Sequence, residues 1–333
     1  MRIVLFASGE FALPTLRWLC SSPYEVARVV TQPDRLSGRG RRPTPTAVRE
    51  LAEQYHLPVL ASEDVNAPAV LDDLARLSAR LGLVIAFGQK LGSRLTVRAA
   101  ESASTSPAVF RCGCVNLHAS LLPRHRGAAP VNYAILSGDE ETGVTVFRLT
   151  ERIDAGDILE TRRTRIREAE TADELHDRLA EIGVEAVQAA LGLFENKQEP
   201  VGTPQPLEGA TRAPKLRKED GWIDFARPAR DVANQIRGLW SWPGAACDYV
   251  SKDGLRRERV ILARARASEP QASAGLPPGT LDGSLLAAAG TGAIEILEIK
   301  PASGRLMSWR DFVNGHRVAI GDRFVTITAR PAA

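Results

Sequence analysis

The opening of the chain constrains its fold more than any other stretch. An apolar run over residues 2–7 predicts a buried strand, and a turn at 8–10 leads into an apolar-periodic helix over 11–20. A second strand is predicted over 26–31. A strand, a helix and another strand form a parallel unit, because the helical crossover returns the chain to the same end of the sheet. The opening therefore predicts an α/β fold with a mostly parallel, Rossmann-like sheet.

The first turn also excludes one common function of such folds. Gly9 is its only glycine, so the turn lacks the G-x-G-x-x-G pattern that admits a dinucleotide pyrophosphate. A nicotinamide-dependent enzyme is therefore not expected. A later strand, over 83–86, is followed by Phe87 and Gly88 in a small turn. This turn is expected at the carboxyl edge of the sheet, where open α/β folds bind ligands.

The most informative polar stretch is Asn116–Gly127, which follows a short apolar run. Residues two apart on a strand share a face, so Asn116 and His118 should point the same way. An amide can donate to a developing oxyanion, and an imidazole can move a proton near neutral pH. Taken alone, the pair also fits a capped turn beside a half-buried histidine, and that plainer interpretation is the commoner one.

Asp154 lies in a glycine-containing turn after a predicted strand, and this turn could reach the same edge of the sheet. A carboxylate beside an imidazole orients it and favours its protonated form. Asn116, His118 and Asp154 together would suit acyl transfer by direct attack of an amine. Ser120 is close, but the chain lacks a G-x-S-x-G elbow there, so an acyl-enzyme is not expected. By itself, Asp154 would be interpreted as a turn cap.

Length and composition predict two domains and a cytoplasmic protein. The 333 residues exceed one ordinary core, and 44% of them are hydrophobic. We expect a catalytic domain over 1–195, a proline-rich linker over 196–210, and a small β-barrel resembling an OB fold over 211–333. No secretion signal or membrane-spanning stretch is evident. The four cysteines form no disulfide framework, and Cys112-x-Cys114 indicates buried thiols rather than a metal site.

The net charge is only +3, but the cations are clustered. Basic islands occur over 35–49, 211–218 and 252–266. Such islands suggest an extended polyanionic partner. Solvated surface arginine explains them equally well, so charge alone leaves the question open.

The order of these motifs resembles the formyltransferases that use 10-formyltetrahydrofolate. The resemblance covers nearly the whole chain and rests on the following segments: Gly9–Ala12, Thr31–Asp34, Gly38–Arg42, Asn116–Pro123, Arg126–Pro130, Glu141–Thr145, Ile153–Asp157, Ala213–Leu216, Ile223–Phe225, Trp242–Pro243 and Asp311–Gly315. The basic loop and the second domain are similar to those of members that formylate methionyl-initiator-tRNA. The resemblance thus implies transfer of a formyl group to the α-amino group of that tRNA, for translation initiation.

Carried over by position, the resemblance implies roles for three sets of residues. The catalytic residues would be Asn116, His118 and Asp154, acting as oxyanion donor, proton shuttle and imidazole orienter. The folate cosubstrate would contact Ser120, Leu121, Leu122, Pro123, Phe87 and Gly88. The tRNA would contact Arg39, Arg41, Arg42, Lys215 and Lys218. No metal is implied, and we expect a monomer, although no sequence feature fixes the oligomeric state.

Two departures from the family pattern concern the rim of the pocket. Ala7-Ser8-Gly9 replaces a Gly-Thr-Pro turn before Glu10, and the segment 101–111 is longer than usual.

Two other functions are alternatives to formylation of a tRNA. A nucleotide-sugar formyltransferase acting on a 4-amino sugar would share the chemistry but need an acidic or sugar-complementary second domain rather than a basic one. A non-catalytic RNA-binding protein on the same scaffold would need a decayed catalytic trio, and here the trio is intact.

Overall fold

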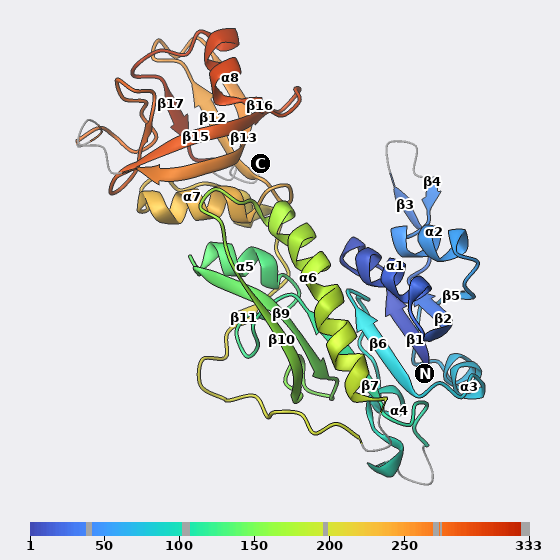
Figure 1. The fold of residues 1–333 in the computed structure, drawn as a ribbon. Helices are drawn as coiled ribbons and strands as arrows, with labels where there is room; N and C mark the ends of the chain where they lie inside the picture. Colours follow the sequence, from blue (N-terminus) through green and yellow to red (C-terminus); the bar gives the residue numbers. More distant parts are fainter. Residues whose placement is uncertain (38–41, 102–106, 196–198, 269–272, 274, 328–333) are drawn as a thin grey trace, which may run out of the picture. The chain divides into compact units, whose positions relative to one another are not determined.

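The computed structural model describes the chain in two compact units (Figure 1). The described residues are 1–37, 42–101, 107–195, 199–268, 273 and 275–327. The first unit comprises Met1–Pro130, Thr142–Thr164 and His176–Ala213, and the second comprises Val131–Glu141, Arg165–Leu175 and Pro214–Ala333. Two short segments that precede Pro214 thus belong to the second unit. The boundaries predicted around the linker stay a prediction.

The first unit is built on a seven-stranded sheet in the order β10-β9-β7-β6-β1-β2-β5 (Figure 1). Its strands are β1 (Arg2–Ala7), β2 (Glu25–Thr31), β5 (Val59–Ala61), β6 (Leu81–Ile85), β7 (Cys114–His118), β9 (Glu141–Arg148) and β10 (Ile158–Arg165). The pairs from β5 through β2, β1 and β6 to β7 are parallel, whereas β9 runs antiparallel to β7. The predicted Rossmann-like, mostly parallel sheet is confirmed.

Helices cover this sheet, and small residues set how closely they approach. They are η1 (Glu10–Ala12), α1 (Leu13–Ser21), α2 (Ala47–Gln54), α3 (Pro68–Arg76), α4 (Ser93–Thr96), η2 (Ala99–Glu101) and α6 (Ala172–Leu193). Gly183 of α6 lies against Leu117 of β7, so closely that an added Cβ would come within 2.7 Å of Leu117 Cδ2. Helix α6 therefore packs directly against β7, the strand that carries Asn116 and His118.

The opposite face of β7 lies over an aromatic core. Cys114 belongs to a buried cluster with Phe6, Phe87 and Phe110. The ring of Phe6 packs edge-on against Phe87 and Phe110, with centroids 5.6 and 6.0 Å apart. Fully buried rings of this size contribute strongly to stability through the apolar area removed from water. The strand end is thus held on both faces.

The second unit is a nearly closed antiparallel barrel. Its strands are β12 (Ala245–Val250), β13 (Arg257–Ser268), β14 (Ala287–Ala288), β15 (Ala293–Pro301), β16 (Met307–Ser308) and β17 (Arg323–Val325), and its order is β14-β15-β13-β12-β17 with β16 beside β15. Bridges from Thr280 to Arg323 and from Leu281 to Ala287 connect the two edge strands. The predicted barrel is confirmed, because these bridges leave little free sheet edge.

The barrel core and the remaining elements complete the second unit. Phe225, Tyr249, Phe312 and Phe324 are buried in one cluster, and Tyr249 donates its hydroxyl to Asp322. Further elements of the chain are α5 (Pro130–Leu136), η3 (Lys218–Gly221), α7 (Ala229–Gly238), α8 (Trp309–His316) and two small ribbons, β3 (Arg35–Ser37) with β4 (Arg42–Thr44) and β8 (Arg126–Gly127) with β11 (Arg212–Ala213). No helix in the described part of the chain has both the length and the apolarity needed to cross a bilayer.

An ion pair in the second unit predicts an acid-sensitive contribution to stability. Arg264 contacts Glu174 through Nη2 at 2.6 Å and lowers the pKa of that carboxyl to about 2. The unfolded pKa is near 4.3, so this stabilisation is present above about pH 4 and is lost as pH falls toward 2. We expect Glu174→Gln, which can still cap α6, to lower the unfolding free energy by about 0.2–1 kcal/mol at pH 7. Thermal unfolding at pH 7 and pH 2.5 measures this, and an equal effect at both pH values would contradict it.

Candidate functional site

The carboxyl end of β7 places Asn116 and His118 at the edge of the sheet. Asn116 pairs with Val84 of β6 and Phe147 of β9, and His118 pairs with Thr145 of β9. The two side chains share one face of the strand because they are two residues apart. Asn116 is half-buried, whereas His118 is 6% exposed. The structure therefore gives both the common orientation that the sequence predicted.

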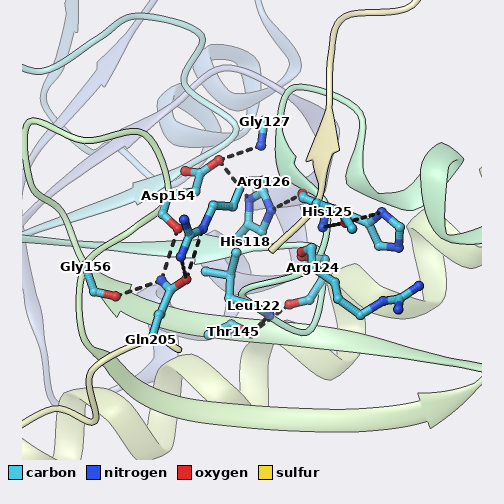
Figure 2. Close-up of polar contacts among 12 residues, drawn as sticks. His118, Leu122, Arg124, His125, Arg126, Gly127, Thr145, Asp154, Gly156 and Gln205 are labelled. Atoms are coloured by element: carbon cyan, nitrogen blue, oxygen red, sulfur yellow. Dashed lines mark hydrogen bonds and ion pairs between the residues drawn. The ribbon is translucent and has the colours of Figure 1, made fainter. Parts of the chain in front are cut away.

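The protein environment fixes the His118 ring and its tautomer. Nε2 lies 2.9 Å from the carbonyl oxygen of His125. A carbonyl can only accept, so Nε2 carries the hydrogen and Nδ1 is the nitrogen left for proton exchange. The Phe147 ring packs edge-on at 6.3 Å between centroids. Figure 2 shows the imidazole between the His125 carbonyl and the Asp154 carboxylate.

Asp154 faces His118 from the turn between β9 and β10. Its Oδ2 lies 3.9 Å from His118 Nδ1 and accepts a hydrogen bond of 2.8 Å from the Gly127 backbone N–H. The distance to Nδ1 is within ion-pair range but longer than a hydrogen bond. Such contacts often tighten when substrate binds. The structure thus brings His118 and Asp154 together although 36 positions separate them in the sequence (154 − 118).

The turn that carries Asp154 has an unusual backbone. Asp154 adopts φ +47°, a left-handed conformation that non-glycine residues rarely take. Two residues later, an added Cβ on Gly156 would lie 1.9 Å from the carbonyl oxygen of Arg148. Only glycine fits there, so the turn folds back tightly against the end of β9. This close approach aims the Asp154 carboxylate toward β7.

The predicted folate residues have their own internal contacts. Ser120 is fully buried, and its Oγ donates to the Arg124 carbonyl at 2.7 Å. Thr145 Oγ1 donates to the Ser120 carbonyl at 2.7 Å and accepts from the Leu122 N–H at 3.2 Å. The loop Ser120–Pro123 is therefore rigidly attached to β9. Its contact with folate stays a prediction.

Phe87 and Gly88, the other predicted folate residues, form a turn shortly after β6. The Phe87 side chain is 2% exposed and belongs to the core, while its carbonyl accepts from Gln32 Nε2 at 2.9 Å. Gly88 has φ +82°, and an added Cβ would meet Gln32 Nε2 at 2.4 Å. A ligand at this turn would therefore meet main chain rather than the phenyl ring.

The sequence analysis missed a cavity beside the Asp154 turn. It has a volume of about 660 Å³ and is lined by residues 148–152 and 155–157, together with the segment 199–202 and Thr96, Arg98, Glu101, Cys112 and Cys114. Cys114 lies two residues before Asn116 and on the same face of β7. Burial raises the pKa of the Cys114 thiol, so this wall of the cavity is uncharged at neutral pH. Within the described residues, no three metal-ligating side chains form a group.

Of the predicted tRNA-binding residues, the two lysines are fully described by the structure and the three arginines are not. Lys215 and Lys218 are exposed, and they lie near the start of Pro214–Ala333, the longest segment of the second unit. Arg39 and Arg41 lie outside the described residues, and of Arg42 only the backbone, in β4, is described. Five of the eleven residues of segment 101–111, namely 102–106, are likewise outside them.

The third basic island is largely neutralised by acids that are distant in the sequence. Arg257 and Arg259 contact Asp248 on the neighbouring strand. Arg264 contacts Glu174 and Glu298, and Arg266 contacts Glu295 at 2.5 Å. Cross-strand neighbours pair here because the register of the barrel places opposite charges side by side. A polyanion would therefore find fewer free cations on this island than its composition suggests.

Comparison with known proteins places the chain in a family. The profile of the formyl transferase family matches residues 1–191, and that of the formyl transferase C-terminal domain matches residues 215–317. The chain therefore belongs to the formyl transferase family, a family of enzymes.

Among curated relatives, the similarity extends over almost the whole chain. The methionyl-tRNA formyltransferase of Halorhodospira halophila is 39% identical over 96% of this chain and 98% of its own length. That of Symbiobacterium thermophilum is 39% identical over 97% of this chain and 95% of its own. Among solved structures, the sugar 3N-formyl transferase WlaRD superposes with a TM-score of 0.63 at 13% identity, covering 92% of this chain and 99% of its own, which shows a shared fold.

Proposed function

We propose that this enzyme transfers the formyl group of 10-formyltetrahydrofolate to the α-amino group of methionyl-initiator-tRNA. The observation that carries the proposal is the placement of Asn116, His118 and Asp154 at one edge of the sheet. The relatives of 39% identity, both methionyl-tRNA formyltransferases, support the choice of acceptor. We further propose that the enzyme acts as a monomer, because one chain supplies all three residues. We also propose that it acts in the cytoplasm.

The three side chains divide the chemistry between them. The amine of the acceptor attacks the formyl carbon, and the carbonyl electron pair moves onto oxygen. Asn116 donates its amide N–H to that oxygen. His118 accepts a proton from the attacking nitrogen at Nδ1 and returns it to the leaving folate nitrogen as the carbon–nitrogen bond breaks. Asp154 stabilises the imidazolium that exists between these two proton transfers, since its carboxylate faces Nδ1.

The cavity beside the Asp154 turn supports binding of the folate ring system. Its volume of about 660 Å³ lies within the usual range for small-molecule sites. Its wall includes Ala155 and Gly156, which directly follow Asp154, so a ligand held there would lie beside the turn that carries the carboxylate. We place Ser120–Pro123, which follow the carboxyl end of β7, around the formyl-bearing part of the same cosubstrate.

A direct assay tests the proposal against its alternatives. The purified enzyme is incubated with 10-formyltetrahydrofolate and methionyl-initiator-tRNA, methionyl-elongator-tRNA or a nucleotide-linked amino sugar. We expect rapid formylation of the initiator tRNA and little of the other two. Preferential formylation of the sugar would contradict the proposed acceptor, and RNA binding without formyl transfer to any acceptor would contradict an enzymatic function.

The exposed lysines that follow Ala213 predict salt-sensitive tRNA binding. Each phosphate contact adds about 0.7–0.9 to the slope of log Kd against log salt concentration. We expect Lys215→Ala and Lys218→Ala each to weaken binding and to lower this slope by about that amount. Arg76→Ala, which removes an exposed cation from α3, serves as the control and should leave the slope unchanged. Filter binding from 50 to 300 mM KCl measures the slopes, and unchanged slopes in both lysine variants would remove these residues from the tRNA path.

A further inference from the structure

The segment Thr203–Ala213, here called the strap, runs along the candidate site instead of hanging free as a linker. Its first residue pairs with Ile158 at the start of β10 through two backbone hydrogen bonds of 2.8 Å. Its last two residues form β11 and pair with β8, Arg212 beside Arg126 and Ala213 beside Gly127. The strap is therefore attached at both ends to the two loops that carry the Asp154 and His118 contacts.

Gln205, in the middle of the strap, joins these two loops through four hydrogen bonds. Its Nε2 donates to the carbonyl oxygens of Asp154 at 3.0 Å and Gly156 at 2.8 Å. Its Oε1 accepts from Nε and Nη2 of Arg126, at 3.1 and 2.6 Å. Figure 2 shows the carboxamide between the Asp154 turn and the Arg126 guanidinium. Both the donor and the acceptor of this side chain are thus used.

These contacts hold a turn that is costly to form. A non-glycine residue in a left-handed conformation costs on the order of 1 kcal/mol and persists only where its surroundings enforce it. Gln205 fixes the carbonyl groups on both sides of Ala155, while Gly127 N–H holds the Asp154 carboxylate. Without Gln205, the turn would lose two of the hydrogen bonds that oppose its rotation. The carboxylate would then have more freedom relative to His118.

The neutral carboxamide also suits the charge on Arg126. Burial lowers the pKa of that guanidinium, and the nearby Arg152 charge lowers it further, while Asp154 opposes both. Gln205 satisfies two N–H groups of Arg126 without adding a second carboxylate beside Asp154.

The other end of the strap holds the partner of His118. Thr211 Oγ1 accepts from the His125 N–H at 2.8 Å, and the His125 carbonyl in turn accepts from His118 Nε2. The Ala213 carbonyl accepts from the N–H groups of Ala128 and Ala129 at 2.7 and 3.2 Å. One segment thus supports both the imidazole and the carboxylate.

We propose that Gln205 is a positioning residue of the active site, which aligns Asp154 with His118 by fixing the 154–156 turn. The kinetic test of this inference rests on the proposed function, whereas the test by the NMR signal of His118 does not. Nothing in the sequence distinguishes Gln205 from other polar residues of a proline-rich linker. Its role follows from a contact between two segments that are far apart in the sequence, because 51 positions separate Gln205 from Asp154.

Two substitutions separate the two halves of the Gln205 side chain. Gln205→Leu removes all four hydrogen bonds, whereas Gln205→Glu keeps an acceptor for Arg126 but cannot donate to the two carbonyls when ionised. We expect kcat for formyl transfer to fall on the order of a hundredfold in both variants, with KM for tRNA and folate changed less than threefold, because the loss is one of alignment. Glu208→Ala, an exposed position of the same strap, is the matched control and should keep full kcat.

A readout independent of activity completes the test. The NMR signal of the His118 ring, assigned by its loss in a His118→Gln variant, should shift in Gln205→Leu and Gln205→Glu and stay in place in Glu208→Ala. Retained kcat and an unmoved His118 signal in both Gln205 variants would overturn the proposal, as would full activity in Gln205→Glu alone. If the wild-type enzyme formylates no tRNA while the His118 signal moves in both variants, the proposed function fails and the positioning role stands.

Discussion

The His118→Ala enzyme should lose about two to four orders of magnitude in kcat for formyl transfer, with little change in KM for either substrate. Proton transfer by a positioned side chain contributes typically 10²–10⁴-fold. His118 is 6% exposed, so bulk water has little access to the space in which the imidazole moves protons. Single-turnover kinetics with saturating tRNA measure the chemical step directly. A His118 variant within tenfold of the wild-type rate would contradict the mechanism.

The chain supplies a matched control for this experiment. His176 Nδ1 lies 3.0 Å from Asp177 Oδ1 on α6, a shorter contact than that between His118 and Asp154. Both side chains of the control pair are much more exposed, at 36% and 82%. Solvent screening makes such a surface pair worth little, and neither residue lines the cavity beside the Asp154 turn. We therefore expect His176→Ala to keep full activity, because a short histidine–aspartate distance alone does not make a catalytic site.

The geometry of the candidate site at the sheet edge could be predicted in part because it depends on local rules. Apolar runs specify strands, strand periodicity places Asn116 and His118 on one face, and the parallel crossover sends successive strand ends to one edge. The motif order then allowed Asp154 to be added. Each of these inferences uses residues within a few positions of one another, or a resemblance that spans the chain.

The contacts that the sequence did not reveal depend on long-range pairing. A proline-rich segment such as 196–210 has the composition of a linker, and composition carries no information about what the segment docks against. Gln205 becomes part of the site only because β11 pairs with β8 and Thr203 pairs with Ile158. The neutralised arginines of the barrel illustrate the same limit, because Arg257 meets Asp248 through the antiparallel register.

Asn116→Ala should lower kcat by about two to three orders of magnitude, which is the usual loss when one oxyanion donor is removed. Asn116 lies in the middle of β7, half-buried, on the strand face that it shares with His118. Charge develops on the formyl oxygen only as the amine attacks, so the amide stabilises the transition state more than the bound substrates. The effect should therefore appear in kcat and kcat/KM alike.

A second substitution at this position distinguishes hydrogen-bond donation from simple packing. Asn116→Asp preserves the size of the side chain but, when ionised, replaces the donor by an acceptor and places a negative charge where the oxyanion forms. If Asn116 donates, the aspartate variant should be at least as impaired as the alanine variant at neutral pH, although it fills the space better. If Asn116 only packs against β6 and β9, the aspartate variant should be the more active of the two. Side-by-side measurement of both variants, with unchanged thermal unfolding as the check on folding, decides between these outcomes.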